Sequence, residues 1–252
     1  MNTNPLLQFD ALPRFGAIQA EHVAPAIDQL LREAEAALER AVGPDVAADY
    51  DALSAVLDVA TERLGRAWGT VSHLNSVADT PEMRAAFNDS LPKVTAFHTR
   101  LGADERLFAK YKAVAASASS AQLPAPRQKA LANALRDFVL SGAELQGAAK
   151  ARFAAIQERT AELSQKFSEH VLDATDGFTF HASTHEMDGV PADVQQATRA
   201  AAQAEGKEGH KLSLKMPVYL PVMQFSRSSA LRERLYRAYV TRASDQAEGD
   251  AQ

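Results

Sequence analysis

Residues 50–71, YDALSAVLDVATERLGRAWGTV, carry apolar side chains at the three- and four-residue spacing of one helix face. The apolar positions are Tyr50, Leu53, Val56, Leu57, Ala60, Leu64, Ala67, Trp68 and Val71. Such a stripe is wide enough to contact more than one neighbouring helix. The stretch therefore predicts a long packed helix in a mostly α-helical protein.

The preceding segment has the same character. Pro25 suits the first turn of a helix, where its missing N–H is not needed. One apolar face follows it through Ile27, Leu30, Leu31, Ala34 and Leu38. Gly43-Pro44 ends this pattern, because proline cannot continue a helix. We therefore expect two long antiparallel helices.

Further helices are predicted as far as residue 171. Thr80-Pro81-Glu82 offers a cap, a first-turn proline and an acid for the helix dipole, and Pro92 predicts a kink or a break in the helix that follows. Other helices are expected over residues 104–116, from Arg127 to Ser141-Gly142, and over residues 147–171. The segment 117–126 is rich in Ala, Ser and Pro without an apolar period, which predicts a flexible loop.

A small β element is predicted near residues 177–216. Phe178 and Phe180 alternate with polar residues, as Leu212, Leu214 and Met216 do, so the two runs are expected to pair across a helix over residues 191–205. The apolar segment 217–221 is interpreted as extended, and a closing helix should begin near Ser226 or Ser228. The fold class is thus mostly α, with long antiparallel helices and this small β element.

Composition excludes several classes of protein. The 252 residues are 46% hydrophobic, which is enough for a substantial core. The net charge is −5, without a long basic run, so a nucleic-acid partner is not expected. There is no cysteine for a disulfide or a thiolate metal site. No apolar run reaches the roughly 18 residues of a membrane span, and we expect a cytoplasmic protein with no membrane partner.

One stretch departs by one residue from a zinc motif. In His-Glu-x-x-His, two imidazoles one helical turn apart hold the metal, whereas His185-Glu186-Met187-Asp188-Gly189 ends in a glycine that offers no ligand. A polar loop is the better interpretation. His181 and His185 are also four residues apart, but a strand that turns into a loop would not bring them together.

No other pattern indicates catalysis. The chain has no Walker-type phosphate loop, no G-x-S-x-G elbow and no cysteine nucleophile. His73 is interpreted as an interior histidine near a helix end, and His22 as a solvated one.

Residues 231–245, LRERLYRAYVTRASD, form the most regular helical pattern near the end of the sequence. Its apolar stripe consists of Leu231, Leu235, Ala238 and Tyr239. A clamp for a peptide or a phosphate could be imagined from Arg232, Arg234, Arg237 and Arg242. Because Glu233 lies four residues before Arg237, a solvated or ion-paired helix face is the better interpretation.

Residues 231–245 also resemble a stretch of the zinc-dependent oligopeptidases related to thimet oligopeptidase. Further short segments that resemble this family occur in the same order: Asn4-Pro5-Leu6-Leu7, Glu21-His22-Val23, VSHLNSV at 71–77, NALRDF at 133–138, VLDAT at 171–175 and YLPVM at 219–223. Each segment alone is weak evidence for the family, whereas their shared order is specific and extends over essentially the whole chain.

The resemblance implies a mostly helical, two-lobed peptidase whose deep channel admits short peptides and excludes folded proteins. It also implies one zinc ion, held by the two histidines of His-Glu-x-x-His and a later glutamate, that activates water for hydrolysis. Neither His-Glu-x-x-His nor the later glutamate of the family can be placed in this sequence. We therefore assign no catalytic and no metal-ligating residue, and the substrate-binding residues stay unassigned.

Residues 1–252 are accordingly expected to form the amino-terminal helical lobe of a longer enzyme, inactive and without zinc on their own. The partner of this lobe would be a carboxy-terminal catalytic region, and apolar surface left without it should promote self-association. The alternative is a free-standing helical module that binds peptides or proteins.

Overall fold

Two long helices, α1 (Val23–Val42) and α2 (Tyr50–Val77), pack against each other as the sequence predicts. One face of α1 is buried and consists of Val23, Ala26, Ile27, Leu30, Leu31, Ala34, Ala37, Leu38 and Ala41. Asp49 starts α2, because its carboxylate accepts hydrogen bonds from the N–H groups of Asp51 and Ala52 at 3.0 and 3.1 Å. These donors have no partner within the first turn of the helix.

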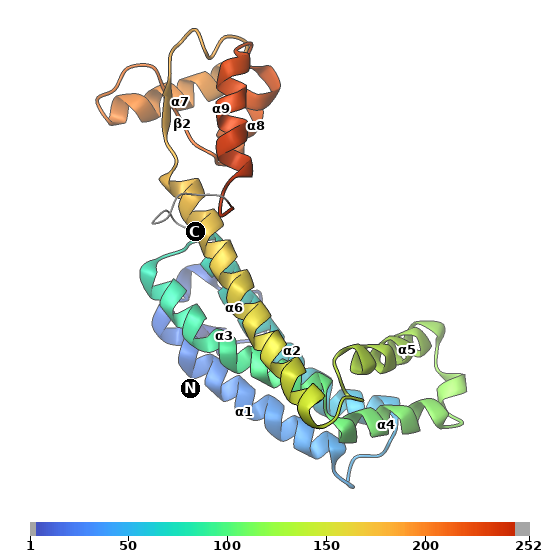
Figure 1. Cartoon of the computed structure of the whole chain (residues 1–252). Coiled ribbons are helices and arrows are strands. Elements are labelled where there is room, and N and C mark those ends of the chain that lie inside the picture. The colour runs from blue at the N-terminus through green and yellow to red at the C-terminus, as the bar shows by residue number, and fades with distance from the viewer. Residues whose placement is uncertain (1–3, 245–252) are drawn as a thin grey trace. The chain divides into compact units, whose positions relative to one another are not determined.

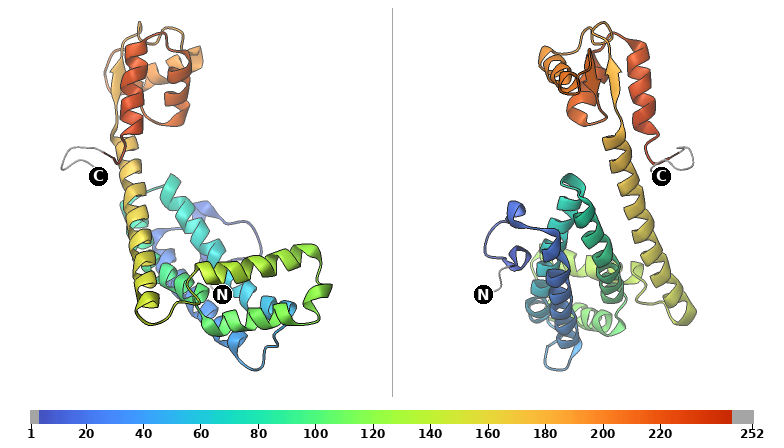
Figure 2. Two further views of the ribbon diagram at one scale, coloured as in Figure 1. Left: turned by 45° about the vertical axis from the view of Figure 1, so that its right-hand side comes forward. Right: turned by 90° about the vertical axis from the view of Figure 1, so that its left-hand side faces the viewer.

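The structure is a computed structural model that describes residues 4–244. The described residues form two compact units, one that ends at residue 162 and one that begins at residue 163. In the first unit, α1 and α2 lie beside α3 (Pro81–Gly102), as Figures 1 and 2 show. Three apolar clusters make up the core of the described residues, two in the first unit and one in the second.

Helix α3 begins where the sequence places it and continues through Pro92. The side chain of Thr80 accepts the N–H of Met83 at 3.2 Å, and Pro81 occupies the first turn. A break at Pro92 is wrong. Val94 and Phe97, on the far side of Pro92, are buried in the same cluster as the residues before it. We infer that this packing outweighs the roughly 3 kcal/mol that an internal proline costs.

Two shorter helices complete this part of the first unit, α4 (Glu105–Ala116) and α5 (Ala125–Leu140). Residues 117–124 connect them, including the 3-10 turn Ser120–Gln122, so α5 begins two residues before the predicted Arg127. The Ser120 hydroxyl donates to the Ala115 carbonyl at 2.9 Å. The connection is therefore hydrogen-bonded to the end of α4.

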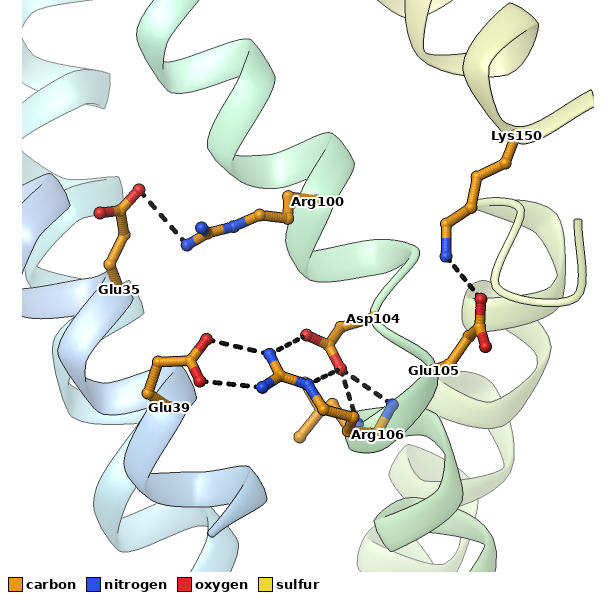
Figure 3. A network of polar contacts seen from close by, with 8 residues as sticks. Glu35, Glu39, Arg100, Asp104, Glu105, Arg106 and Lys150 are labelled. Atoms are coloured by element: carbon orange, nitrogen blue, oxygen red, sulfur yellow. Dashed lines mark hydrogen bonds and ion pairs between the residues drawn. The ribbon is translucent and has the colours of Figure 1, made fainter. Parts of the chain in front are cut away.

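A network of ions fixes α4 to α1 (Figure 3). The Arg106 guanidinium donates to both oxygens of Glu39 at 2.9 Å and to Asp104 at 2.7 Å. Burial opposes ionisation of Asp104, but hydrogen bonds from Arg106 and from the N–H of Leu107 prevail and lower its pKa. Figure 3 also shows ion pairs from Arg100 to Glu35 at 3.3 Å and from Lys150 to Glu105 at 2.8 Å.

The last long helix, α6 (Gly147–Gly177), is six residues longer than its apolar pattern predicts. In the second unit, strands β1 (Phe180–Ala182) and β2 (His210–Leu212) pair antiparallel, with Phe180 opposite Leu212. Helix α7 (Ala192–Ala204) lies between them in sequence and packs on β2. The predicted β element and the helix between its strands are therefore confirmed, although β2 lies before most of the predicted run.

The extended segment predicted at 217–221 is wrong, because these residues belong to helix α8 (Met216–Phe225). Pro217 lies in its first turn, where no N–H is required, and Pro221 removes one internal hydrogen bond. Tyr219 and Val222, three residues apart, are buried in the core of the second unit. Helical spacing of these two side chains satisfies the core, which extended spacing would not.

Helix α9 (Ser229–Val240) follows, and the Ser228 hydroxyl caps it by accepting the N–H of Leu231 at 3.2 Å. The predicted start near Ser228 is confirmed. The helix ends at Val240 within the quoted stretch 231–245, whose last residue, Asp245, lies outside the described residues.

Candidate functional site

The loop from His185 to Gly189 does not form a metal site. The Glu186 carboxylate accepts hydrogen bonds from both the N–H and the hydroxyl of Ser183 at 2.8 Å, and the backbone bond is the main cause of its lowered pKa. His185 is exposed. Residues 4–244 contain no group of three histidines, cysteines or carboxylates arranged to hold a metal ion.

Gly189 instead lets this loop approach the corner between α8 and α9. Its φ of +90° is in the left-handed region, and a side chain there would collide with the carbonyl oxygen of Phe225. The N–H of Arg227 donates to the Asp188 carbonyl at 2.9 Å. The hydroxyl of Ser226 donates to the Glu186 carbonyl at 2.8 Å. The loop is therefore hydrogen-bonded to the corner between α8 and α9, and it agrees with the predicted polar loop.

The other histidines do not form a ligand pair. Nε2 of His181 lies 3.4 Å from a carboxylate oxygen of Glu205. His73 is exposed on α2 and meets the ring of Phe15 edge-on at 5.4 Å, so its interpretation as an interior residue is wrong. His22 is half-buried, and its Nδ1 accepts the N–H of Gln19 at 3.0 Å, so it is not simply solvated.

The arginines of α9, and Arg242 just after it, are engaged within the second unit. Arg237 pairs with Glu233 at 2.8 Å, as the sequence predicts. Arg234 lies over the ring of Phe180 at 4.4 Å. Arg242 lies over the ring of Tyr239 at 3.6 Å and donates to the hydroxyl of Thr175 at 2.7 Å, and the Arg232 side chain donates to the Ser226 carbonyl. These contacts favour a structural role over a clamp for a peptide or a phosphate.

Two adjoining grooves in the first unit are the best candidate for a binding site. The larger has a volume of about 510 Å³ and is lined by Trp68, Val94, Thr95, His98, Thr99, Asp137, Leu140, Ser141, Phe153 and Gln157. The smaller, of about 280 Å³, shares His98, Asp137 and Ser141 with it and reaches Asp58 and Tyr111. Side chains of α2 to α6 thus meet around His98, Asp137 and Ser141.

Two glycines shape the wall where α3 and α5 end. A Cβ at Gly102 would lie 2.8 Å from Cβ of Ser141, closer than real side chains approach, so only glycine fits there without a shift. Gly142 has a φ of +85° and turns the chain from α5 toward α6. The ring of Phe153 then lies against this turn, since a Cβ at Gly142 would be 3.3 Å from it.

The grooves combine aromatic walls with polar groups. Trp68 stacks on Phe87 with ring centroids 4.5 Å apart, which fixes one wall. His98 as a whole residue is exposed, but its ring is partly buried against the groove. This partial burial lowers the pKa of His98 and so favours the neutral imidazole. Burial, and next the nearby Asp58 carboxylate, raise the pKa of Tyr111 to about 12. One oxygen of Asp137 accepts two hydrogen bonds from Arg136 at 2.7 and 3.0 Å. Such a surface can bind a polar or an apolar group.

The sequence did not point to the groove. Its shared residues are His98 on α3, Asp137 on α5 and Ser141 directly after α5, and these two helices are adjacent only after folding. Asp137 falls in the word NALRDF that carried the family resemblance, yet nothing marks its side chain as a lining residue. Only the unusual pair Ser141-Gly142, predicted as a helix end, indicated the turn that forms this wall.

A sequence model of the family described as "Neurolysin/Thimet oligopeptidase, N-terminal domain" matches residues 27–150, which include α2 to α5 and most of α1. The chain carries the amino-terminal domain of the neurolysin/thimet oligopeptidase family. The family resemblance is thus confirmed, and the groove lies mainly within the matched segment, with Phe153 and Gln157 just beyond it.

Several oligopeptidases of this family are similar over nearly the whole chain. This chain is 41% identical to oligopeptidase A of Salmonella typhimurium and 40% identical to that of Escherichia coli. Each alignment covers 97% of this chain and 36% of the relative. A probable cytosolic oligopeptidase A of Arabidopsis thaliana is 37% identical, with the same shares covered. The chain thus spans about a third of the length of these relatives.

Proposed function

We propose that the chain is the amino-terminal part of a zinc metallo-oligopeptidase that hydrolyses short peptides within a deep channel. One observation carries the proposal: the chain is 41% identical over 97% of its length to an oligopeptidase A of which it spans 36%. Residues 1–252 would supply the amino-terminal helical lobe, and a carboxy-terminal catalytic region would supply the chemistry. We further propose that the enzyme is cytoplasmic.

The described residues do not fit the zinc ion of this proposal. Gly189 stands where a second histidine would be needed, and its backbone conformation and close contact with Phe225 leave no room for one. The ligands would therefore have to come from outside residues 4–244, and no catalytic step is assigned to this chain. On its own, the chain should hydrolyse no peptide.

No helix within residues 4–244 has the length and apolar character needed to span a membrane.

The proposal is tested by reading the gene beyond the codon for Gln252. It requires an open reading frame that encodes His-Glu-x-x-His and a later glutamate. The intact polypeptide should then contain one zinc per chain and cleave a short peptide, and a chelator should abolish both properties. The 252-residue chain, assayed beside it at equal concentration, should contain no stoichiometric zinc and leave the peptide intact.

A stop codon directly after Gln252 would overturn the proposal in favour of a free-standing helical module that binds peptides or proteins. The groove around His98, Asp137 and Ser141 would then be the first place to look for its ligand. Peptide cleavage and one tightly bound zinc in the 252-residue chain would contradict both functions.

A further inference from the structure

Another groove of the first unit is lined by charges of both signs. It has a volume of about 520 Å³, within the range of small-ligand sites. Its lining comes from the segment before α1, from α1 and from α2, and consists of Leu7, Gln8, Phe9, Asp10, Gln29, Leu30, Glu33 and Arg63. The lining thus contains one cation and two carboxylates.

These opposite charges do not pair with each other. Arg63 makes no ion pair with any described residue, and its guanidinium lies over the ring of Phe9, 5.6 Å from the ring centroid. The Glu33 carboxylate accepts a hydrogen bond from the side-chain amide of Gln29 at 2.8 Å. Neither Glu33 nor Asp10 has a cationic partner in the described part of the chain. The charges of the groove therefore stay available to a ligand with complementary charges.

Contacts with uncharged groups hold the wall of the groove in place. Arg66 on α2 donates to the carbonyl of Phe9 at 3.1 Å and to that of Ala11 at 2.9 Å. These two carbonyls lie on either side of Asp10, so its backbone is fixed against α2. The ring of Phe9 packs against the core of the first unit and supports Arg63 from below through a cation–π contact. A wall that is ordered before binding loses less entropy when a ligand arrives.

The two signs of charge indicate which class of ligand fits. Asp10 and Glu33 would repel an anion such as a nucleotide, and an inorganic cation would leave Arg63 without a partner. A ligand that carries both an ammonium and a carboxylate group can pair with both sides.

Peptides with free termini are such ligands. Two extended residues place the termini up to about 7 Å apart, whereas a free amino acid carries both charges on one carbon. Because Arg63 makes no ion pair with Asp10 or Glu33, the separation of the charges favours a peptide over a free amino acid.

We propose that this groove binds a short peptide by both of its termini. The Arg63 guanidinium donates to the carboxylate of the peptide, and the carboxylates of Asp10 and Glu33 accept hydrogen bonds from its ammonium group. Leu7 and Leu30 supply apolar contacts for its side chains. A peptidase releases short peptides with free termini, so its own products would fit. Only this source of the ligand rests on the proposed function.

Calorimetric titration of the 252-residue chain with the dipeptide alanyl-alanine tests this proposal. N-acetyl-alanyl-alanine lacks the ammonium group, and alanyl-alanine amide lacks the carboxylate. Each should bind about tenfold or more weakly than the free dipeptide, because each leaves a charge of the groove without its partner. Free alanine should also bind more weakly than the dipeptide.

Variants of the groove provide the second arm. With Arg63→Gln, the dipeptide and its amide should bind equally, whereas the acetylated form should still bind more weakly. The double variant Asp10→Asn, Glu33→Gln should instead remove the preference over the acetylated form. Arg40→Gln, at an exposed position of α1 outside the groove, should leave both preferences unchanged. Far-UV circular dichroism shows whether each variant is folded.

The proposal is overturned by equal binding of the dipeptide and its blocked forms, by tighter binding of free alanine, or by no binding at millimolar concentration. These measurements use the unaltered chain, so they decide the matter even where a variant does not fold. A folded Arg63→Gln variant that still prefers the dipeptide over its amide would overturn it as well. If the gene encodes the zinc motif beyond Gln252 and the dipeptide does not bind, this inference alone fails. A stop codon after Gln252 rejects the proposed function and leaves the dipeptide result unaffected.

Discussion

Helices α1 and α6 have similar sequence patterns and opposite surroundings. Both carry apolar residues at helical spacing over their length. The 20 residues of α1 include nine that are buried, whereas the 31 residues of α6 include none. The difference lies in their neighbours: α1 packs against α2, α3 and α4. An amphipathic pattern thus predicts a helix and its interacting face, but not whether the described chain contains the partner.

The most direct way to break this comparison is to truncate one side chain on each helix. Leu38 is completely buried, so Leu38→Ala should lower the free energy of unfolding by about 2–5 kcal/mol through lost apolar contact and a cavity. Phe167 is 56% exposed, so Phe167→Ala in the 252-residue chain should change it by less than about 0.5 kcal/mol. Urea unfolding followed by far-UV circular dichroism measures both.

Trp68, the single tryptophan, provides an independent signal from the first unit. Its fluorescence should follow the loss of stability caused by Leu38→Ala. Equal destabilisation by the two substitutions would mean that α6 is as well packed as α1, and the comparison would fail.

Sequence reasoning succeeded where one segment carries its own signal. Thr80 and Ser228 each mark a predicted helix start, because their side chains replace hydrogen bonds that the backbone lacks there. It failed at Pro92 and in α8, where burial of residues on both sides of a proline outweighs the local preference of that proline. The groove escaped prediction for a related reason. Its lining comes from five helices, and their packing is a property of the whole unit.

A second test asks whether the near-match to the zinc motif can be completed. Gly189→His restores the letters of His-Glu-x-x-His, yet we expect no zinc binding, because residues 185–189 form a loop and not a helix. The positive φ and the collision with the Phe225 carbonyl should also destabilise the second unit by about 2 kcal/mol or more. Zinc content measured by mass spectrometry and unfolding in urea test the two expectations.

Gly206→Ala is the control for backbone strain. Gly206 also has a positive φ, of +69°, but nothing lies within 4 Å of the position where its Cβ would be. Gly206→Ala should therefore lower the free energy of unfolding less than Gly189→Ala does, because only the Cβ at position 189 would collide with a neighbouring atom. Stoichiometric zinc in the Gly189→His variant would instead mean that the loop can rearrange into a metal-binding helix.

The third test extends the comparison to the core of the second unit, which contains a titratable group. His210 is fully buried, and its Nδ1 lies 3.0 Å from the Thr198 hydroxyl. Burial, and then the charge of Arg199, lower the pKa of His210 below its ordinary value of 6.5. The folded state thus favours the neutral ring. Its stabilising contribution is complete above pH 6.5 and is lost as the pH falls toward the lower pKa of the folded state.

Hydrogen exchange of the β2 amides at pH values from 7.5 to 5 measures this loss in the second unit alone. His210→Gln should flatten the pH dependence, because glutamine does not titrate. His185→Gln, at an exposed position, should preserve it. A pH profile that is the same with and without His210 would show that its ring does not govern the acid response.

The smallest expected effects concern polar contacts, and here too α1 and α6 should differ. Asp104 is 9% exposed and caps α4, which packs on α1, so Asp104→Ala should cost about 1 kcal/mol of stability, as the loss of an N-cap usually does. The pair between Arg159 and Glu162 on α6 is solvated, with side chains 60 and 46% exposed. Arg159→Ala in the 252-residue chain should therefore cost no more than about 0.5 kcal/mol.

Raising the salt concentration should reduce the effect of Arg159→Ala more than that of Asp104→Ala, because screening weakens exposed pairs and leaves the backbone hydrogen bonds of a cap largely intact. If Arg159→Ala proves the more damaging substitution at low salt, α6 must be held by contacts that the described structure does not contain.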